Sequence, residues 1–144
     1  LPGSSDPAIA LDTTDHLLTL SSDGHVRRFG VTLERRLTLL SGGTTLVGQD
    51  RMLAAGKTQS GLLAIRFHLA PGIMVRRNRG EGIVRLVLPN GAVWSFLWEG
   101  ARFREEESVP ESAYVGFHKT RQLVLEAEVS PDAEVAWIFT LEQG

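Results

Sequence analysis

The chain has 144 residues, about the length of one domain, and its 42% hydrophobic and 22% charged residues are typical of a soluble globular protein. A formal net charge of −2 argues against non-specific binding to nucleic acid, which needs a basic excess. The absence of cysteine excludes disulfides, thiolate metal sites and cysteine nucleophiles. No apolar run approaches the roughly 20 residues of a membrane-spanning helix, so we expect no membrane partner.

The N-terminal residues suggest that the chain is a piece of a longer protein. It begins with Leu1 instead of Met, and residues 1–7 (LPGSSDP) lack the basic and apolar regions of a signal peptide. We expect residues 1–7 to form a flexible arm and residues 1–144 to form a single domain.

The first clear strand pattern covers residues 31–39, where apolar and polar residues alternate as in a half-buried strand. Its predicted inward face consists of Val31, Leu33, Arg35, Leu37 and Leu39. An arginine on that face requires a bulge, a strand edge or a buried ion pair. The candidate partners of Arg35 are Asp50, one of Glu105 to Glu107, or a strand neighbour of Glu34.

The same alternation recurs along the rest of the chain, and turn sequences separate the segments at intervals of about 8–12 residues. The predicted inward sets are Leu63, Ile65, Phe67 and Leu69; Val84, Leu86 and Leu88; Trp94, Phe96 and Trp98; Leu123, Leu125, Ala127 and Val129; and Val135, Trp137, Phe139 and Leu141. Residues 101–107 are expected to be an edge strand. In the turn Pro89-Asn90-Gly91, the Asn-Gly pair tolerates positive φ at both central positions, which predicts a tight hairpin. The pattern predicts an all-β, antiparallel β-sandwich of roughly ten to twelve strands.

The side chains available for catalysis are few. None of the four histidines has a metal-binding spacing, although a site assembled from distant strands, such as His68 with His118, stays open. There is no Gly-x-Ser-x-Gly motif for a serine nucleophile. The run Glu105-Glu106-Glu107 offers paired carboxylates, but a solvated strand edge that resists aggregation is the favoured interpretation. We therefore predict no catalytic residue, metal or cofactor in this chain.

Several basic side chains are candidates for binding an anionic polymer. Arg28 belongs to a short basic cluster, although such clusters are more often polar strand faces or turns. Arg66 and His68 project from the outer face of an apolar strand. The three tryptophans share strand faces with phenylalanines or leucines, which predicts core positions and not an exposed sugar-stacking row. The candidate substrate-binding residues are thus Arg28, Arg66 and His68.

Seven stretches, taken in order and spacing, resemble the C-terminal domain of bacterial heparinase II/III-like proteins. They are residues 23–30 (DGHVRRFG), 34–39 (ERRLTL), 46–51 (LVGQDR), 66–71 (RFHLAP), 88–91 (LPNG) with Trp94, 106–109 (EESV) and 120–125 (TRQLVL). The resemblance covers most of the chain from about residue 22 onward. Each stretch alone has little specificity, and their combination carries the resemblance.

The resemblance implies a parent polysaccharide lyase in which an N-terminal α/α toroid precedes a β-sandwich. Such an enzyme cleaves uronic-acid-containing polysaccharides by β-elimination, and its tyrosine, histidine and asparagine would lie upstream of Leu1. The single tyrosine here, Tyr114, has no matching motif around it. The expected partners are an acidic polysaccharide, bound through the parent enzyme, and the missing toroid. The compartment would be the bacterial periplasm or cytoplasm.

Two alternatives remain at this point: a free-standing carbohydrate-binding module and a structural interaction domain. A binding module needs two or more exposed aromatic side chains in a flat row, so the burial of the tryptophans distinguishes it from a lyase domain.

Overall fold

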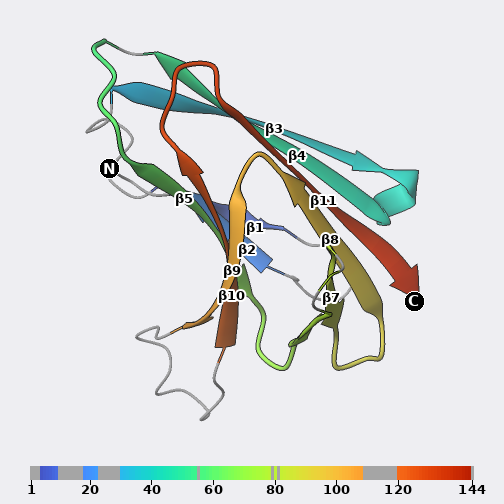
Figure 1. The fold of residues 1–144 in the computed structure, drawn as a ribbon. Coiled ribbons are helices and arrows are strands. Elements are labelled where there is room, and N and C mark those ends of the chain that lie inside the picture. The colour runs from blue at the N-terminus through green and yellow to red at the C-terminus, as the bar shows by residue number, and fades with distance from the viewer. Residues whose placement is uncertain are drawn as a thin grey trace.

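The computed structural model describes residues 4–9, 18–22, 30–54, 56–78, 80, 82–108 and 120–143 (Figure 1). These residues contain eleven β-strands, one short 3-10 turn (η2) and no α-helix, which confirms the predicted all-β class and strand number. The elements are β1 (Ser4–Ile9), β2 (Leu18–Ser22), β3 (Val31–Leu40), η2 (Ser41–Gly43), β4 (Thr45–Ala54), β5 (Leu62–Leu69), β6 (Met74–Arg77), β7 (Val84–Val87), β8 (Val93–Glu99), β9 (Arg102–Ser108), β10 (Thr120–Glu128) and β11 (Glu134–Gln143).

The strands form two antiparallel sheets that pack into a sandwich (Figure 1). Sheet A has five strands in the order β1-β2-β5-β10-β9, and sheet B has six in the order β3-β4-β11-β8-β7-β6. Residues 4–7, expected to be part of a flexible arm, lie in β1, where Ser4 and Ser5 pair with Ser22 and Ser21 of β2. The predicted edge strand is confirmed, because β9 lies at the edge of sheet A.

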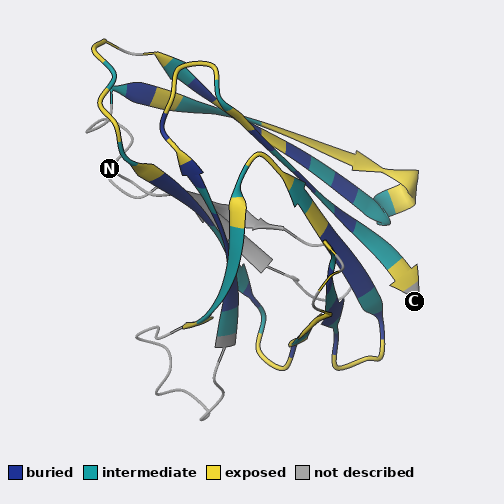
Figure 2. Cartoon of the chain, viewed as in Figure 1, coloured by how far each residue is buried: buried dark blue, intermediate teal, exposed yellow. Residues whose placement is uncertain are grey.

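The core lies between the sheets and consists mostly of the alternate residues that the sequence placed inward (Figure 2). It also includes Leu46, Met52, Ile73 and Ala92, which the pattern did not predict, whereas Leu33, Trp98 and Leu141 are only partly buried. In β5 the inward residues are all buried, and their partners in β10 are buried as well. Phe67 of sheet A lies at the centre of an aromatic cluster. Its ring contacts Phe96, Trp137 and Phe139 of sheet B edge-on, with centroids 5.2, 4.9 and 5.5 Å away. This geometry suits the ring quadrupoles and ties the two sheets together.

A glycine makes room for the largest core residue of sheet B. Gly48 of β4 lies directly opposite Trp137 of β11. A Cβ atom added to Gly48 would lie 2.1 Å from Cζ2 of the indole, so no larger residue fits without displacing the ring. The indole lies across β4, where Nε1 donates a hydrogen bond to Oδ2 of Asp50 at 3.0 Å.

Asp50 is also the partner that Arg35 was predicted to require. The two residues lie opposite each other in β3 and β4, and Nε of Arg35 contacts Oδ1 of Asp50 at 2.6 Å. The Asp50 side chain is fully buried and that of Arg35 is 11% exposed. Burial of these charges is tolerated because the carboxylate is bonded on both oxygens.

The predicted burial of β3 is wrong over its second half. Val31 is fully buried, but Leu37 and Leu39 are 45% and 55% exposed. The alternation itself is correct, because both leucines lie on the inward-facing side, opposite Gly48 and Leu46. The physical reason is position: the end of the β3–β4 hairpin extends outward and is largely exposed (Figure 2). Periodicity reports the face of a strand, not whether anything covers that face.

The hairpin at Pro89-Asn90-Gly91 forms where predicted, but its conformation differs. Leu88 and Ala92 flank it, with a backbone hydrogen bond of 2.9 Å from Leu88 N to Ala92 O. Gly91 has φ of 89°, whereas Asn90 is not among the positive-φ residues. Oδ1 of Asn90 instead accepts a hydrogen bond from Ala92 N at 2.9 Å. The asparagine therefore stabilises the turn through its side chain.

Candidate functional site

The outer face of sheet A carries the two candidate residues that the structure describes. The odd-numbered residues of β5 enter the core, so Arg66 and His68 face outward and are partly exposed, as predicted. Arg66 lies opposite Val124 of β10, and His68 lies opposite Gln122. Arg28 lies outside the described residues, as do the other three histidines.

Arg66 belongs to an ion-pair network that spans β5, β10 and β9. Its Nη1 contacts Glu106 Oε1 at 2.9 Å, and Gln122 Nε2 donates to the same oxygen at 3.0 Å. The other oxygen of Glu106 contacts Arg104 Nε at 2.5 Å. Arg104 also bonds Glu126 through Nη1, at 2.7 Å. We call these five side chains the Glu106 network.

The acidic run that contains Glu106 lies on β9 at the edge of sheet A, as expected, and Glu107 is exposed, but Glu105 and Glu106 are also ion-paired. Consecutive glutamates do point to opposite faces, as expected for a strand. Glu106 faces outward into the network, however, and Glu105 pairs with Arg121. The basic partners come from β5, β9 and β10, which lie far apart in sequence. A single strand pattern does not reveal partners brought together by the sheet.

The network also encloses an apolar residue. Val124 lies directly opposite Arg66 on one side and Arg104 on the other, and it is fully buried although it faces outward. The aliphatic stems of arginines cover apolar neighbours while the guanidinium groups remain at the surface. Both arginines are therefore fixed at their stems by packing and at their heads by Glu106.

The electrostatics of this face keep Glu106 ionised and favour neutral His68. Hydrogen bonds from Arg104, and next from Arg66, lower the pKa of Glu106. Hydrogen bonds to Glu126 and Glu106 raise the pKa of Arg104. Partial burial lowers the pKa of His68, and the positive charge of Arg66 lowers it further. At neutral pH His68 thus contributes hydrogen bonding and not a second positive charge.

One polar atom on this face lacks a partner. Gln122 is 9% exposed, and its Oε1 is buried without a hydrogen-bond partner among the described residues. A buried acceptor left in this state is unfavourable by roughly 1–3 kcal/mol. Because Nε2 of the same amide is bonded to Glu106, the amide orientation is fixed, and the buried Oε1 faces the interior of the sheet surface and not a ligand.

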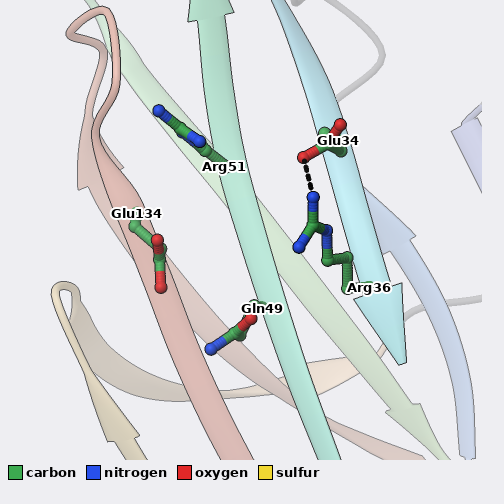
Figure 3. Close-up of a pocket in the computed structure, with 5 residues that line it drawn as sticks. All are labelled: Glu34, Arg36, Gln49, Arg51 and Glu134. Carbon is green, nitrogen blue, oxygen red and sulfur yellow. Dashed lines mark ion pairs between the residues drawn. The ribbon is translucent and has the colours of Figure 1, made fainter. Parts of the chain in front are cut away.

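The described residues also line a depression on sheet B and a groove beside β6. On the outer face of sheet B, Glu34, Arg36, Gln49, Arg51 and Glu134 line a shallow depression (Figure 3). Its charges are mixed, and Arg36 contacts Glu34 at 3.5 Å. The second hollow is an open groove lined by residues of β6 and by the Glu105–Arg121 pair. Neither contains a candidate residue from the sequence.

The described residues show no prepared metal centre. No group of three or more histidine or acidic side chains among them is placed to hold an ion. No helix in the described part is long and apolar enough to cross a membrane.

Comparison with known proteins identifies the family. Residues 8–138 match the family described as heparinase II/III-like, C-terminal. The chain belongs to this family. The resemblance seen in the sequence is thereby confirmed, and the domain is the C-terminal one. No curated protein matches the chain by sequence.

Two solved structures share the fold of this heparinase II/III-like domain. Heparan sulfate lyase HepC from Pedobacter heparinus superposes with a TM-score of 0.62 at 14% sequence identity. A mutant of the same lyase gives a TM-score of 0.61 at 13% identity. Each match covers 99% of this chain and 22% of the lyase chain. The chain thus corresponds to about a fifth of those proteins.

Proposed function

We propose that this chain is the C-terminal sandwich of a polysaccharide lyase that cleaves uronic-acid-containing polysaccharides by β-elimination. The observation that carries the proposal is the family match over residues 8–138. The shared fold of a heparan sulfate lyase supports it. In this proposal an upstream α/α toroid, in a periplasmic or cytoplasmic bacterial enzyme, supplies the main catalytic residues. The sandwich supports one wall of the sugar cleft.

The Glu106 network is the part of this domain best suited to such a wall. The side chain of Arg66 is one-third exposed. Its guanidinium has five N–H donors, and one of those on Nη1 is bonded to Glu106. A sugar carboxylate or sulfate is an appropriate partner for that guanidinium. His68, which is partly exposed on the same face and favoured in its neutral form, would add a hydrogen bond to the sugar. We propose Arg66 and His68 as substrate-binding residues, with Arg28 as a third.

The alternative of a free-standing carbohydrate-binding module receives less support from the described residues. Trp94 and Trp137 are 2% exposed and belong to the core. Trp98 is half-buried and stacks on Phe96 and Phe103, with centroids 5.6 and 4.7 Å away. No flat row of exposed aromatic rings is present in the described part of the chain.

The experiment is Arg66→Ala in the full-length lyase that contains this domain. We expect KM for the polysaccharide to rise or kcat to fall, because a guanidinium that orients the anionic sugar is lost. The matched control is Arg85→Ala, which removes an arginine bonded to Glu142, also at 2.9 Å, on sheet B. If the two variants have the same kinetics and stability as the unchanged enzyme, Arg66 has no role in the cleft.

A further inference from the structure

Strand β3 is an edge whose outer side pairs with no described strand. Sheet B begins with β3, which has β4 as its neighbour on one side. The two pair over ten residues without a register shift. In such a ladder, alternate residues of β3 direct their N–H and C=O groups away from β4. An extended row of this kind is a template for another strand.

Several of the features that block strand edges are missing from β3, and its charges can pair with one another. It contains no proline and no bulge, and it is longer than a typical protected edge. An inward-pointing charge is another common protection, and Arg35 occupies such a position. Its contact with Asp50 neutralises that charge, so it offers little resistance to pairing.

Three of the five exposed leucines among the described residues lie at the end of this edge. Leu37, Leu39 and Leu40 are 45%, 55% and 47% exposed within four consecutive residues. Leu37 and Leu39 lie on the inner side of sheet B, and the tip of the hairpin stands out as an exposed region (Figure 2). An apolar cluster of this kind marks an interaction surface.

The sequence of β3 is complementary to itself when read in the opposite direction. With two antiparallel copies centred on Arg35, Glu34 of each copy lies opposite Arg36 of the other. The flanking pairs are Leu33 with Leu37, Thr32 with Thr38, and Val31 with Leu39. All are favourable cross-strand combinations. At the centre the two Arg35 side chains meet, each already bonded to its own Asp50.

The neighbouring registers of two antiparallel β3 strands give less favourable cross-strand pairs. Centring the pair on Glu34 places two glutamates opposite each other, and centring it on Arg36 places Arg35 opposite Leu37, so both registers lose the Glu34–Arg36 pairs. A shift by one residue would put the inner face of one copy beside the outer face of the other.

From these observations we propose that β3 is a dimerisation edge, where two copies of this chain pair antiparallel about a two-fold axis centred on Arg35. The two six-stranded sheets B then become one continuous sheet of twelve strands. Leu37 and Leu39 are covered by Leu33 and Val31 of the second copy. The interface is isologous, so each contact occurs twice.

The test uses sedimentation velocity of the 144-residue chain at high micromolar concentration, where we expect a dimer. Glu34→Arg and Arg36→Glu each convert two attractive contacts into repulsive ones. Each should raise the dimer dissociation constant about tenfold or more. An equimolar mixture of the two variants should dimerise again, because one copy then presents two arginines and the other two glutamates. This recovery separates the proposed register from general effects of charge.

The matched control is Arg76→Glu on β6, at the opposite edge of sheet B, which should leave association unchanged. Circular dichroism of each variant verifies that it is folded. Recovery of the dimer in the mixture shows that a variant which is monomeric alone lacks only a complementary partner and is not unfolded. A monomeric unchanged chain would overturn the proposal, as would variants that dimerise normally alone or fail to recover when mixed.

Discussion

Asp50 illustrates how much of this fold depends on single residues. Its side chain has no exposed surface, yet it bonds to Arg35 through one oxygen and to Trp137 through the other. The sequence predicted that Arg35 needs a partner and included Asp50 among several candidates. It did not select Asp50, because the choice depends on the register between β3 and β4.

Removing Asp50 should destabilise the chain strongly. Asp50→Ala leaves the guanidinium of Arg35 largely buried without its carboxylate, and breaking such a pair costs about 3–5 kcal/mol. Urea unfolding followed by tryptophan fluorescence measures the change. Arg51→Ala is the control, because the pair of Arg51 with Asp132 is exposed on both sides and should contribute at most about 1 kcal/mol. Equal losses in the two variants would contradict a special role for Asp50.

Gly48 gives a second prediction at this scale. Its hydrogen side chain is what allows the Trp137 indole to lie across β4, so Gly48→Ala should destabilise the domain by roughly 1–3 kcal/mol through overpacking. Gly82→Ala is the matched control, since a Cβ there meets nothing within 4 Å. Urea midpoints of the two variants provide the comparison, and an unchanged midpoint for Gly48→Ala would show that the indole moves aside easily. The sequence gives no sign of this contact, because Trp137 lies on a distant strand.

At the scale of elements, periodicity predicted which face each strand presents, but not what lies beside that face. The inward sets of β5 and β10 are buried as expected. Leu37 and Leu39 lie on the predicted face and are nevertheless exposed, because the hairpin end is not covered. Glu106 lies on an outward face and is nevertheless bonded to two arginines. Coverage and ion pairing are properties of the assembled sheets.

The Glu106 network should contribute to the acid sensitivity of the domain. The folded state lowers the pKa of Glu106 below its ordinary value of 4.5, so its stabilising contribution is full above that pH. The contribution is lost as the pH falls through the lowered value. We therefore expect the urea midpoint of the unchanged chain to fall more steeply below about pH 4.5 than that of Glu106→Gln.

The control for this series is Glu128→Gln, which removes one negative charge from an exposed position on β10. It separates the loss of the network from the change in net charge. If the urea midpoints of the unchanged chain and of Glu106→Gln fall in parallel as the pH decreases, the arginines do not stabilise the Glu106 carboxylate more in the folded state than in the unfolded state.

At the scale of the whole molecule, the fold class, strand number and family followed from the sequence, because alternation and turn spacing repeat along the whole chain. The sequence predicted only part of the candidate site. Arg66 and His68 face outward as expected, but the sequence did not indicate Arg104, Gln122 or Glu126, and it did not connect Glu106 with Arg66. Their association requires three strands to adopt one register, and no local signal encodes it.

If the upstream part of the parent enzyme supplies the main catalytic residues, as proposed, the isolated domain should fold but should not catalyse the reaction. The purified 144-residue chain should fold into an all-β structure, with far-UV circular dichroism showing less than about a quarter helix. It should also show no lyase activity on heparin, heparan sulfate or alginate-like polymers. The reason is that the single tyrosine, Tyr114, has no matching catalytic motif around it, so no tyrosine–histidine base pair is recognisable in the sequence.

Absorbance of the unsaturated uronic product measures that activity directly, and the full-length lyase serves as the positive control. Turnover by the isolated chain that is abolished by Arg66→Ala or by a histidine substitution within the chain would refute the proposed role of the upstream part. Catalysis would then belong to this domain, and the outer face of sheet A would have to be a catalytic surface. Absence of turnover by a folded chain, together with a kinetic defect of Arg66→Ala in the complete enzyme, would place the domain beside the substrate without assigning it the chemistry.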